Sequence, residues 1–195
     1  MEYKLFFGIA SSIAAVFIFI PYIQDIFRNK TKPHAYSWLI WSILLTVGVA
    51  AAFKEGAGYG AWASTINAAL CLSVFFLSLQ YGTKNITRFD TICLLGALLA
   101  IALYLLLADP LLAVIVVALI DFVGFLPTMR KGYAEPWTET PSAFAIATLA
   151  NSLSLFAIQN YTIVTVLYVA TLVLTNAMML AILLARRRQV ERIPV

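Results

Sequence analysis

The chain has 195 residues, of which 63% are hydrophobic and only 11% are charged, with a net charge of +4. A soluble domain carries about 25% charged residues, so this composition excludes an ordinary water-soluble fold. The apolar residues fall in runs of roughly 18 to 25 residues, the length at which a helix crosses a lipid bilayer. No polar stretch is long enough to form a separate soluble domain. We therefore expect an all-α membrane protein.

Seven apolar runs can be drawn along the chain, and in lipid each must be a helix, because its backbone polar groups have no water to bind. Pro110 and Pro141 suit the first turns of their helices, where a missing N–H costs nothing. Short polar turns at 54–58 and 159–160 predict antiparallel neighbours. The runs are Leu5–Asp25, Ala35–Phe53, Gly58–Tyr81, Thr91–Ala108, Pro110–Met129, Thr140–Ile158 and Tyr161–Ala185.

The basic residues divide unevenly between the two faces that alternate loops define. One face holds Lys4 and Lys54. The other holds Arg28, Lys30, Lys32, Lys84, Arg88, Arg130, Lys131, Arg186, Arg187, Arg188 and Arg192. Because positive charge is retained in the cytoplasm during insertion, we expect the N-terminus outside and the Arg-rich tail inside, in the plasma membrane of a bacterium or archaeon. The same distribution explains the basic balance without nucleic acid as a partner.

Two stretches of the chain share a pattern. Residues 19–41 read FIPYIQDIFRNKTKPHAYSWLIW, and residues 125–144 read FLPTMRKGYAEPWTETPSAF. Both contain Phe-x-Pro at the end of an apolar run, then a basic loop, then Pro-x-Ala-aromatic at the next entry. We interpret 1–85 and 109–187 as two copies of a three-helix unit. A copy in the same orientation needs one extra crossing before it, which 86–108 supplies, and 188–195 form a cytoplasmic tail.

This layout resembles the PQ-loop superfamily, which includes SWEET, SemiSWEET and cystinosin-like transporters. The likeness rests on a proline near the inner end of the first helix, a basic loop, a Ser-containing entry to the second helix, and the 3+1+3 order. It covers nearly the whole chain. The glutamine that names the motif is replaced by Tyr22 in the first copy and by Thr128 in the second. The resemblance implies a small-solute transporter that works by alternating access.

The two prolines of the repeated pattern are candidate hinges. Pro21 lies about 16 residues and Pro127 about 17 residues into their runs, so at ~1.5 Å per residue both fall in the inner half of the membrane. A proline inside a helix removes one backbone hydrogen bond and kinks it. Matched kinks suit a gate, and the family resemblance assigns this proline a hinge role. Prolines are also simply frequent in membrane helices.

Asp121 is the sharpest single residue of the sequence. It lies about 11 residues past Pro110, or ~17 Å along a helix, close to the centre of a ~30 Å hydrocarbon core. A carboxylate costs on the order of 3 kcal/mol there, so it should face the interior, either paired or protonated. Such a carboxyl suits proton coupling or the binding of a cationic group. A protonated aspartic acid that joins two helices is the structural alternative. Its counterpart in the first copy is Ala15.

Three asparagines are the other deep polar side chains: Asn67, Asn151 and Asn176. Counted from Pro33 and Pro141, Asn67 and Asn176 fall at equivalent points of the third helix of each copy, and the resemblance implies a facing pair that binds the solute. An amide offers two donors and two acceptors without burying a charge. Aligning Tyr59 with Tyr161 instead separates the pair by two turns. Hydrogen bonding between helices is the alternative role.

The aromatic and loop residues near the inner end allow two interpretations. Trp38, Trp62 and Trp137 are expected to be interfacial anchors, whereas Trp41, one turn deeper, can face a cavity and stack on a flat solute. We expect His34, the only histidine, to be a solvated loop residue. Asp25, Arg28 and Lys32 either form an inner ion-pair cluster or lie in water. Cys71 and Cys93 lie in apolar runs and are expected to be inert.

The sequence contains no catalytic constellation, so we expect neither enzymatic activity, nor a cofactor, nor a metal. The favoured hypothesis is a transporter for a small polar solute such as a sugar, an amino acid or a related metabolite. Asn67, Asn176, Asn151, Trp41 and Asp121 would contact the solute, with Pro21 and Pro127 as hinges and Asp121 as the proton-coupling group. The alternatives are a vitamin-type carrier, a non-transporting receptor and a structural membrane subunit. The lipid bilayer is the other partner, and a homo-oligomer is compatible with the sequence.

Overall fold

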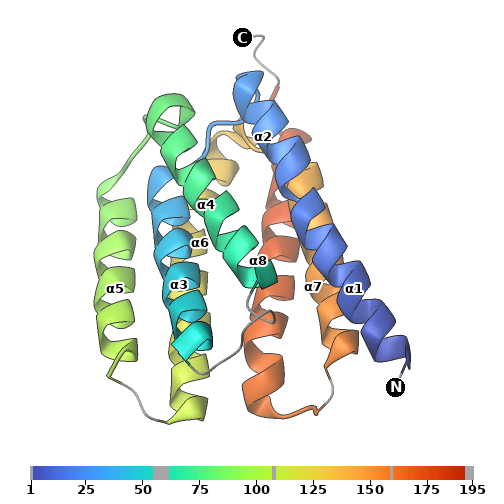
Figure 1. Cartoon of the computed structure of the whole chain (residues 1–195). Helices are drawn as coiled ribbons and strands as arrows, with labels where there is room; N and C mark the ends of the chain where they lie inside the picture. The colour runs from blue at the N-terminus through green and yellow to red at the C-terminus, as the bar shows by residue number, and fades with distance from the viewer. Residues whose placement is uncertain (1, 55–61, 107–108, 159, 192–195) are drawn as a thin grey trace.

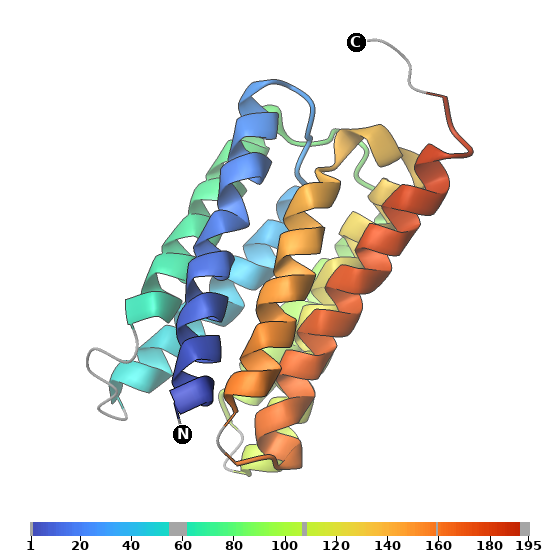
Figure 2. The same cartoon turned by 90° about the vertical axis from the view of Figure 1, so that its right-hand side faces the viewer.

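The computed structural model describes residues 2–54, 62–106, 109–158 and 160–191. This part of the chain is helical and contains no strand, and its helices run side by side (Figure 1; Figure 2). The elements are α1 (Glu2–Phe17), α2 (Phe19–Phe27), α3 (Ala35–Lys54), α4 (Trp62–Tyr81), α5 (Arg88–Tyr104), α6 (Pro110–Ala134), the short 3-10 helix η2 (Pro136–Thr138), α7 (Pro141–Ala157) and α8 (Ile163–Arg187).

Each of the seven apolar runs corresponds to one helix, except that the first is divided into α1 and α2. Within the described residues, three helices are long and apolar enough to cross a membrane: Tyr3–Phe27, Leu111–Ala134 and Thr165–Arg187. The prediction of an all-helical protein is therefore confirmed for the described residues, and the three long apolar helices are compatible with membrane association. Seven crossings in a 3+1+3 order stay a prediction. The turn at 55–61, Leu107, Ala108 and Gln159 lie outside the described residues.

The two prolines act differently on their helices. In the first copy the helix is interrupted at Ile18, between α1 and α2, and Pro21 lies in the first turn of α2. Since Pro21 has no N–H to donate to Phe17, four residues earlier, the interruption falls where the missing hydrogen bond weakens the helix. In the second copy α6 continues through Pro127. The sequence predicted matched kinks at the two prolines, but only the helix that contains Pro21 is interrupted.

Counting α1 and α2 as one helix, we divide the helices in chain order into a first group (α1–α4) and a second group (α6–α8), and α5 packs on one member of each, α3 and α6. In each group the third helix packs on the other two: α4 on α3 and on α1 and α2, and α8 on α6 and α7. Within the described residues no Cα atoms of the first and second helices of a group come within 8 Å of each other. Between the groups, α1 packs on α7 and α3 on α6, so each first helix contacts the other group's second helix. Helix α5 lies at the edge, against α6 and α3 (Figure 1).

Nearly all basic residues lie at one end of the bundle, which we call the basic end. It comprises the segments 25–38, 81–90, 127–140 and 185–191, where α2, α4, α6 and α8 finish and α3, α5 and α7 begin. Of the described Lys and Arg residues, only Lys4 and Lys54 lie toward the opposite end, and Arg192 lies outside the described residues. The chain doubles back three times here, which brings distant polar segments together.

Large apolar side chains cover the outer surface of the helices. Leu5, Phe6, Ile92, Leu99 and Ile163 are each more than 60% exposed. Such a continuous apolar exterior is a liability in water, and it marks a surface that contacts a membrane or another protein.

Candidate functional site

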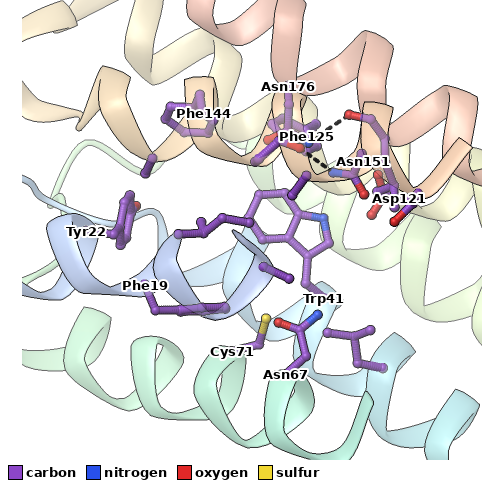
Figure 3. A pocket seen from close by; sticks show the side chains of 18 of the residues that line it. Phe19, Tyr22, Trp41, Asn67, Cys71, Asp121, Phe125, Phe144, Asn151 and Asn176 are labelled. Carbon is purple, nitrogen blue, oxygen red and sulfur yellow. Dashed lines mark hydrogen bonds between the residues drawn. The ribbon is translucent and has the colours of Figure 1, made fainter. Parts of the chain in front are cut away.

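A cavity of about 200 Å³ lies between the two groups of three helices. Its lining comes from every α-helix except α5, and it includes all five side chains that the sequence singled out for solute contact: Trp41, Asn67, Asp121, Asn151 and Asn176. Figure 3 shows these side chains projecting into one space from α3, α4, α6, α7 and α8. Neither Pro21 nor Pro127 belongs to the lining.

Asp121 and Trp41 each carry a buried polar atom that lacks a hydrogen-bond partner among the described residues: Oδ2 of the carboxyl and Nε1 of the indole. Asp121 is 4% exposed. Gly124, three residues after Asp121, lies on the same face of α6, and a Cβ there would be 3.3 Å from Trp41 Nε1. The carboxyl of Asp121 and the indole N–H of Trp41 therefore lie at the same face of α6. A buried polar group without a partner is costly, and the cavity wall carries two such atoms.

The asparagines use their amide groups on their own helices. Nδ2 of Asn151 donates to Ala147 O at 2.8 Å, and Nδ2 of Asn176 donates to Leu172 O at 2.8 Å. These bonds fix the amides against α7 and α8. In Figure 3 the Trp41 indole lies between Asn67 on one side and Asn151 with Asn176 on the other. Asn67 and Asn176 thus line one cavity, but an aromatic ring projects between them.

Aromatic rings form much of the remaining wall, and most of them were not assigned to a site from the sequence. Trp41 packs on Phe125 with centroids 4.8 Å apart and edge-on to Trp38 at 5.2 Å. Phe19 and Phe125 are the first residues of the two repeated stretches, and both are buried in the wall. That correspondence was a usable signal. The other aromatic members of the lining are Tyr22, Phe144 and Tyr168.

Trp38 was predicted to be an interfacial anchor, and this interpretation is wrong. It is 8% exposed and lines the cavity. Its Nε1 donates to the Tyr22 hydroxyl at 3.2 Å, and that hydroxyl donates to Glu139 Oε2 at 3.3 Å. The hydrogen bond from the indole to a buried phenol holds Trp38 inside. Trp137 is partly buried at the basic end and donates to Val190 O, and the side chain of Trp62 lies outside the described residues.

A buried ion pair closes the basic end beside the cavity. Lys131 Nζ lies 2.6 Å from Glu139 Oε1, and both side chains are fully buried. Lys131 also donates to the carbonyl oxygens of Thr138, at 3.0 Å, and of Lys32. The acceptor on Lys32 and the Tyr22 donor belong to the first group, whereas Lys131 and Glu139 belong to the second. The pair therefore joins the two groups.

Further hydrogen bonds join the groups at the same end. The Thr31 and Thr140 hydroxyls bond to each other, and Thr140 also donates to Asp25 Oδ2 at 3.0 Å. Thr128 Oγ1 donates to Ser37 Oγ at 2.9 Å. The sequence suggested an ion-pair cluster of Asp25 with Arg28 and Lys32. Among the described residues, the Asp25 carboxylate instead accepts from the Thr140 hydroxyl, and so contributes to the contacts that join the two groups.

His34 was expected to be solvated, but it is fully buried. Its Nε2 lies 3.4 Å from Asp90 Oδ2, and Asp90 also accepts Nε and Nη2 of Arg130 at 2.9 Å each. Burial lowers the pKa of His34 to about 4, although the Asp90 carboxylate opposes that shift. Asp90 caps α5 as well, accepting from Thr87 N at 2.7 Å. The cluster ties the start of α5 to the start of α3 and to the end of α6.

The site offers hydrogen-bonding groups and one carboxyl. Among the described residues, no group of three His, Cys, Asp or Glu side chains could hold a metal ion. Cys71 lines the cavity and Cys93 is a buried residue of α5; both are free thiols. The arrangement supplies a small, partly open space with one carboxyl, three amides and an indole N–H, walled by aromatic rings.

Comparison of the chain with protein-family models, with curated proteins and with solved structures found no match.

Proposed function

We propose that this chain moves a small polar solute across a membrane by alternating access between its two groups of three helices. The observation that carries the proposal is the shared cavity: five residues chosen from the sequence, on five different helices, line one space of about 200 Å³. A structural subunit has no need to converge Asp121, Trp41 and three asparagines on an internal space with unpartnered polar atoms.

The helix arrangement supports an internal repeat with both copies upright. The third helix packs between the other two in each group, and the contacts between groups exchange first and second helices. A two-fold axis along the bundle produces that pattern, and parallel repeats in transporters are related by such an axis. In this proposal all seven apolar helices cross the membrane, α5 links the copies, the basic end faces the cytoplasm and the N-terminus lies outside. The PQ-loop resemblance leads to the same organisation.

The closure at the basic end supports a gate at that side. Trp38 and Tyr22 belong both to the cavity wall and to the hydrogen-bond chain that ends on Glu139. A solute that displaces either ring therefore acts on the Lys131–Glu139 pair. Opening requires the groups to separate at Thr31–Thr140 and at Lys131–Lys32, with the helix interruption at Ile18 and with Pro21 and Pro127 absorbing the movement.

Asp121 is the group through which transport is linked to protons in this proposal. Its carboxyl faces the cavity, and no lysine, arginine or histidine belongs to the described lining. Without a fixed basic partner, its charge state can change during the cycle. Carboxyl groups in such positions are the usual proton-carrying groups of membrane transporters.

The proposal is tested with purified protein in proteoliposomes. Labelled sugars, amino acids, amines and vitamins are screened for counterflow, and hits are retested with a pH gradient. We expect Asp121→Asn to abolish pH-driven uptake while counterflow persists. Asp109→Asn is the matched control, because Asp109 is an exposed N-cap of the same helix and Asn caps equally well. Absence of flux for every solute class would contradict the proposal, and unchanged pH dependence would remove Asp121 from the mechanism.

A further inference from the structure

The described lining of the cavity contains an acidic side chain but no lysine, arginine or histidine. Asp121 is the only ionisable acid or base with a full charge among the described residues that line it, and its unpartnered Oδ2 is buried there. An isolated buried carboxylate is strongly destabilised unless a positive group joins it. The wall provides no such group. If Asp121 is ionised in the loaded state, the ligand must supply the compensating charge.

The hydrogen-bonding inventory is compatible with a cation. Asn151 and Asn176 each donate one amide N–H, to Ala147 O and Leu172 O, which leaves one N–H and the carbonyl oxygen of each amide for a ligand. The carboxyl of Asp121 adds acceptors only. Trp41 Nε1 is a buried donor that lacks a partner among the described residues. The lining therefore has acceptors for an ammonium group and a donor for one ligand oxygen.

The aromatic wall favours a cation over a neutral polar group. The Trp41 and Phe125 rings lie with their centroids 4.8 Å apart and are tilted by 59°, and Trp38 lies edge-on to Trp41. Aromatic faces attract ammonium groups, most strongly where water is excluded. The same faces also cover the apolar carbons of an amine. At ~30 Å³ per water, a volume of about 200 Å³ has room for about seven waters, so the ligand must be a small metabolite rather than a peptide.

We infer that the transported solute is a small organic cation: an alkylammonium with a compact apolar body and one hydroxyl or ether oxygen. The ammonium lies between Asp121 and the Trp41 ring, and the oxygen accepts the hydrogen bond from Trp41 Nε1. Gly124 makes this arrangement possible, since a Cβ there would lie 3.0 Å from Ile40 Cγ2 and would crowd the indole N–H. The inference deepens the proposed transport function and rests on it for the movement of the bound cation.

The test compares two probes of one shape on the unmodified protein. Choline and its neutral carbon isostere, 3,3-dimethylbutan-1-ol, differ only in charge. We measure equilibrium binding of labelled choline to the full-length protein in nanodiscs and its displacement by the isostere, by N,N-dimethylethanolamine and by glucose. We expect N,N-dimethylethanolamine to displace choline, and the two neutral compounds to bind at least about tenfold more weakly than choline, as the loss of one charged interaction implies. Equal affinity of choline and its isostere would overturn the inference.

Two variants sharpen the result. Asp121→Asn should weaken choline binding about tenfold to a hundredfold and leave the isostere unchanged, whereas the matched Asp109→Asn should alter neither. Gly124→Ala should also weaken choline binding, by displacing Trp41. Choline binding that Asp121→Asn leaves intact would overturn the inference. Because the probe comparison uses the unmodified chain, the test does not depend on the folding of any variant.

The failure of this inference is distinct from the failure of the proposed function. Counterflow of sugars or other neutral solutes, with no preference for ammonium compounds, would overturn the cation assignment and leave transport standing. Selective ammonium binding without flux of any solute would support the cation site and contradict transport.

Discussion

Two regions of this molecule bury carboxyl groups in opposite ways. At the basic end, Lys131 and Glu139 are paired 2.6 Å apart, and Asp90 meets both Arg130 and His34. In the cavity, about midway along the bundle, Asp121 and Trp41 leave buried polar atoms without partners among the described residues. Removing one partner of a buried ion pair strongly destabilises the protein. A buried carboxyl without a partner lowers the stability of the protein, and its presence therefore indicates a ligand. The same kind of substitution should therefore have opposite effects in the two regions.

The largest expected effect is at the ion pair. Lys131→Met leaves the Glu139 carboxylate buried without its cation and should lower the free energy of unfolding by about 3–5 kcal/mol. Thermal unfolding in detergent measures this. Lys84→Met, at an exposed position, is the control and should stay within about 0.5 kcal/mol of the parent. Adding Glu139→Gln to Lys131→Met should restore most of the loss, and a double variant no more stable than the single one would show that the pair is not the cause.

The next effect is a pH dependence that His34 produces. Since burial lowers the pKa of His34 to about 4 from its usual 6.5, the unfolded chain binds a proton before the folded one as the pH falls. The stabilisation is complete above about pH 6.5 and is lost as the pH falls toward 4, by about 3 kcal/mol in all. His34→Gln should flatten the melting temperature across that window. A parent protein equally stable at pH 7 and pH 4.5 would contradict the buried neutral histidine.

Asp121→Asn should have the opposite sign from Lys131→Met. Removing an unpartnered buried carboxylate leaves the empty protein's stability unchanged or raises it, by about 1–2 kcal/mol. Uptake driven by a pH gradient should be lost at the same time. A parallel melting curve and flux assay on one preparation measures both. A variant that is strongly destabilised would mean that Asp121 has a structural partner, and the contrast between the two regions would fail.

The smallest effect lies where the regions meet. Tyr22→Phe removes the hydroxyl that accepts from Trp38 Nε1 and donates to Glu139 Oε2. The loss should be about 1–2 kcal/mol, because the ring still packs against Trp38. Tyr81→Phe serves as the matched control, since Tyr81 packs through its ring on Phe27 at the edge of the same end. A Tyr22→Phe variant as stable as Tyr81→Phe would remove the phenol from the closure.

Much of the helical framework follows from local composition. The seven apolar runs predict the helices because helix formation satisfies the backbone inside an apolar stretch, whatever the rest of the chain does. Pro110 and Pro141 mark helix starts correctly, each in the first turn. A kink at Pro21 was expected, but the helix is interrupted at Ile18, next to Phe17, whose carbonyl receives no hydrogen bond from Pro21. The sequence pattern does not explain why α6 continues through Pro127 without a break.

The basic end is where sequence reasoning fails, and the reason is distance along the chain. Lys131 meets Lys32 from 99 positions away, and Tyr22 meets Glu139 from 117. No local spacing encodes such a pair. The prediction for His34 is wrong for the same cause: a loop histidine is typically exposed, but here Asp90, from the segment 81–90, packs against it. Trp38 is held inside by Tyr22, 16 positions earlier, on the other side of the turn between α2 and α3. Asp121 was easier to single out, since a carboxyl inside an apolar run is conspicuous without any partner.

The central claim is that the groups separate at the basic end and expose the cavity there. Cysteines replacing Thr31 and Thr140, whose hydroxyls are in contact, would lock that end when oxidised, in a chain whose Cys71 and Cys93 are alanines. A third cysteine, Asn67→Cys in the cavity, is labelled with a membrane-impermeant maleimide applied from the basic side, and labelling is read by mass spectrometry on the peptide that carries position 67 alone. We predict labelling in the reduced protein and its loss after cross-linking, with labelling from the opposite side retained. Labelling from the basic side that cross-linking leaves unchanged, or that never occurs in the reduced protein, would contradict the account.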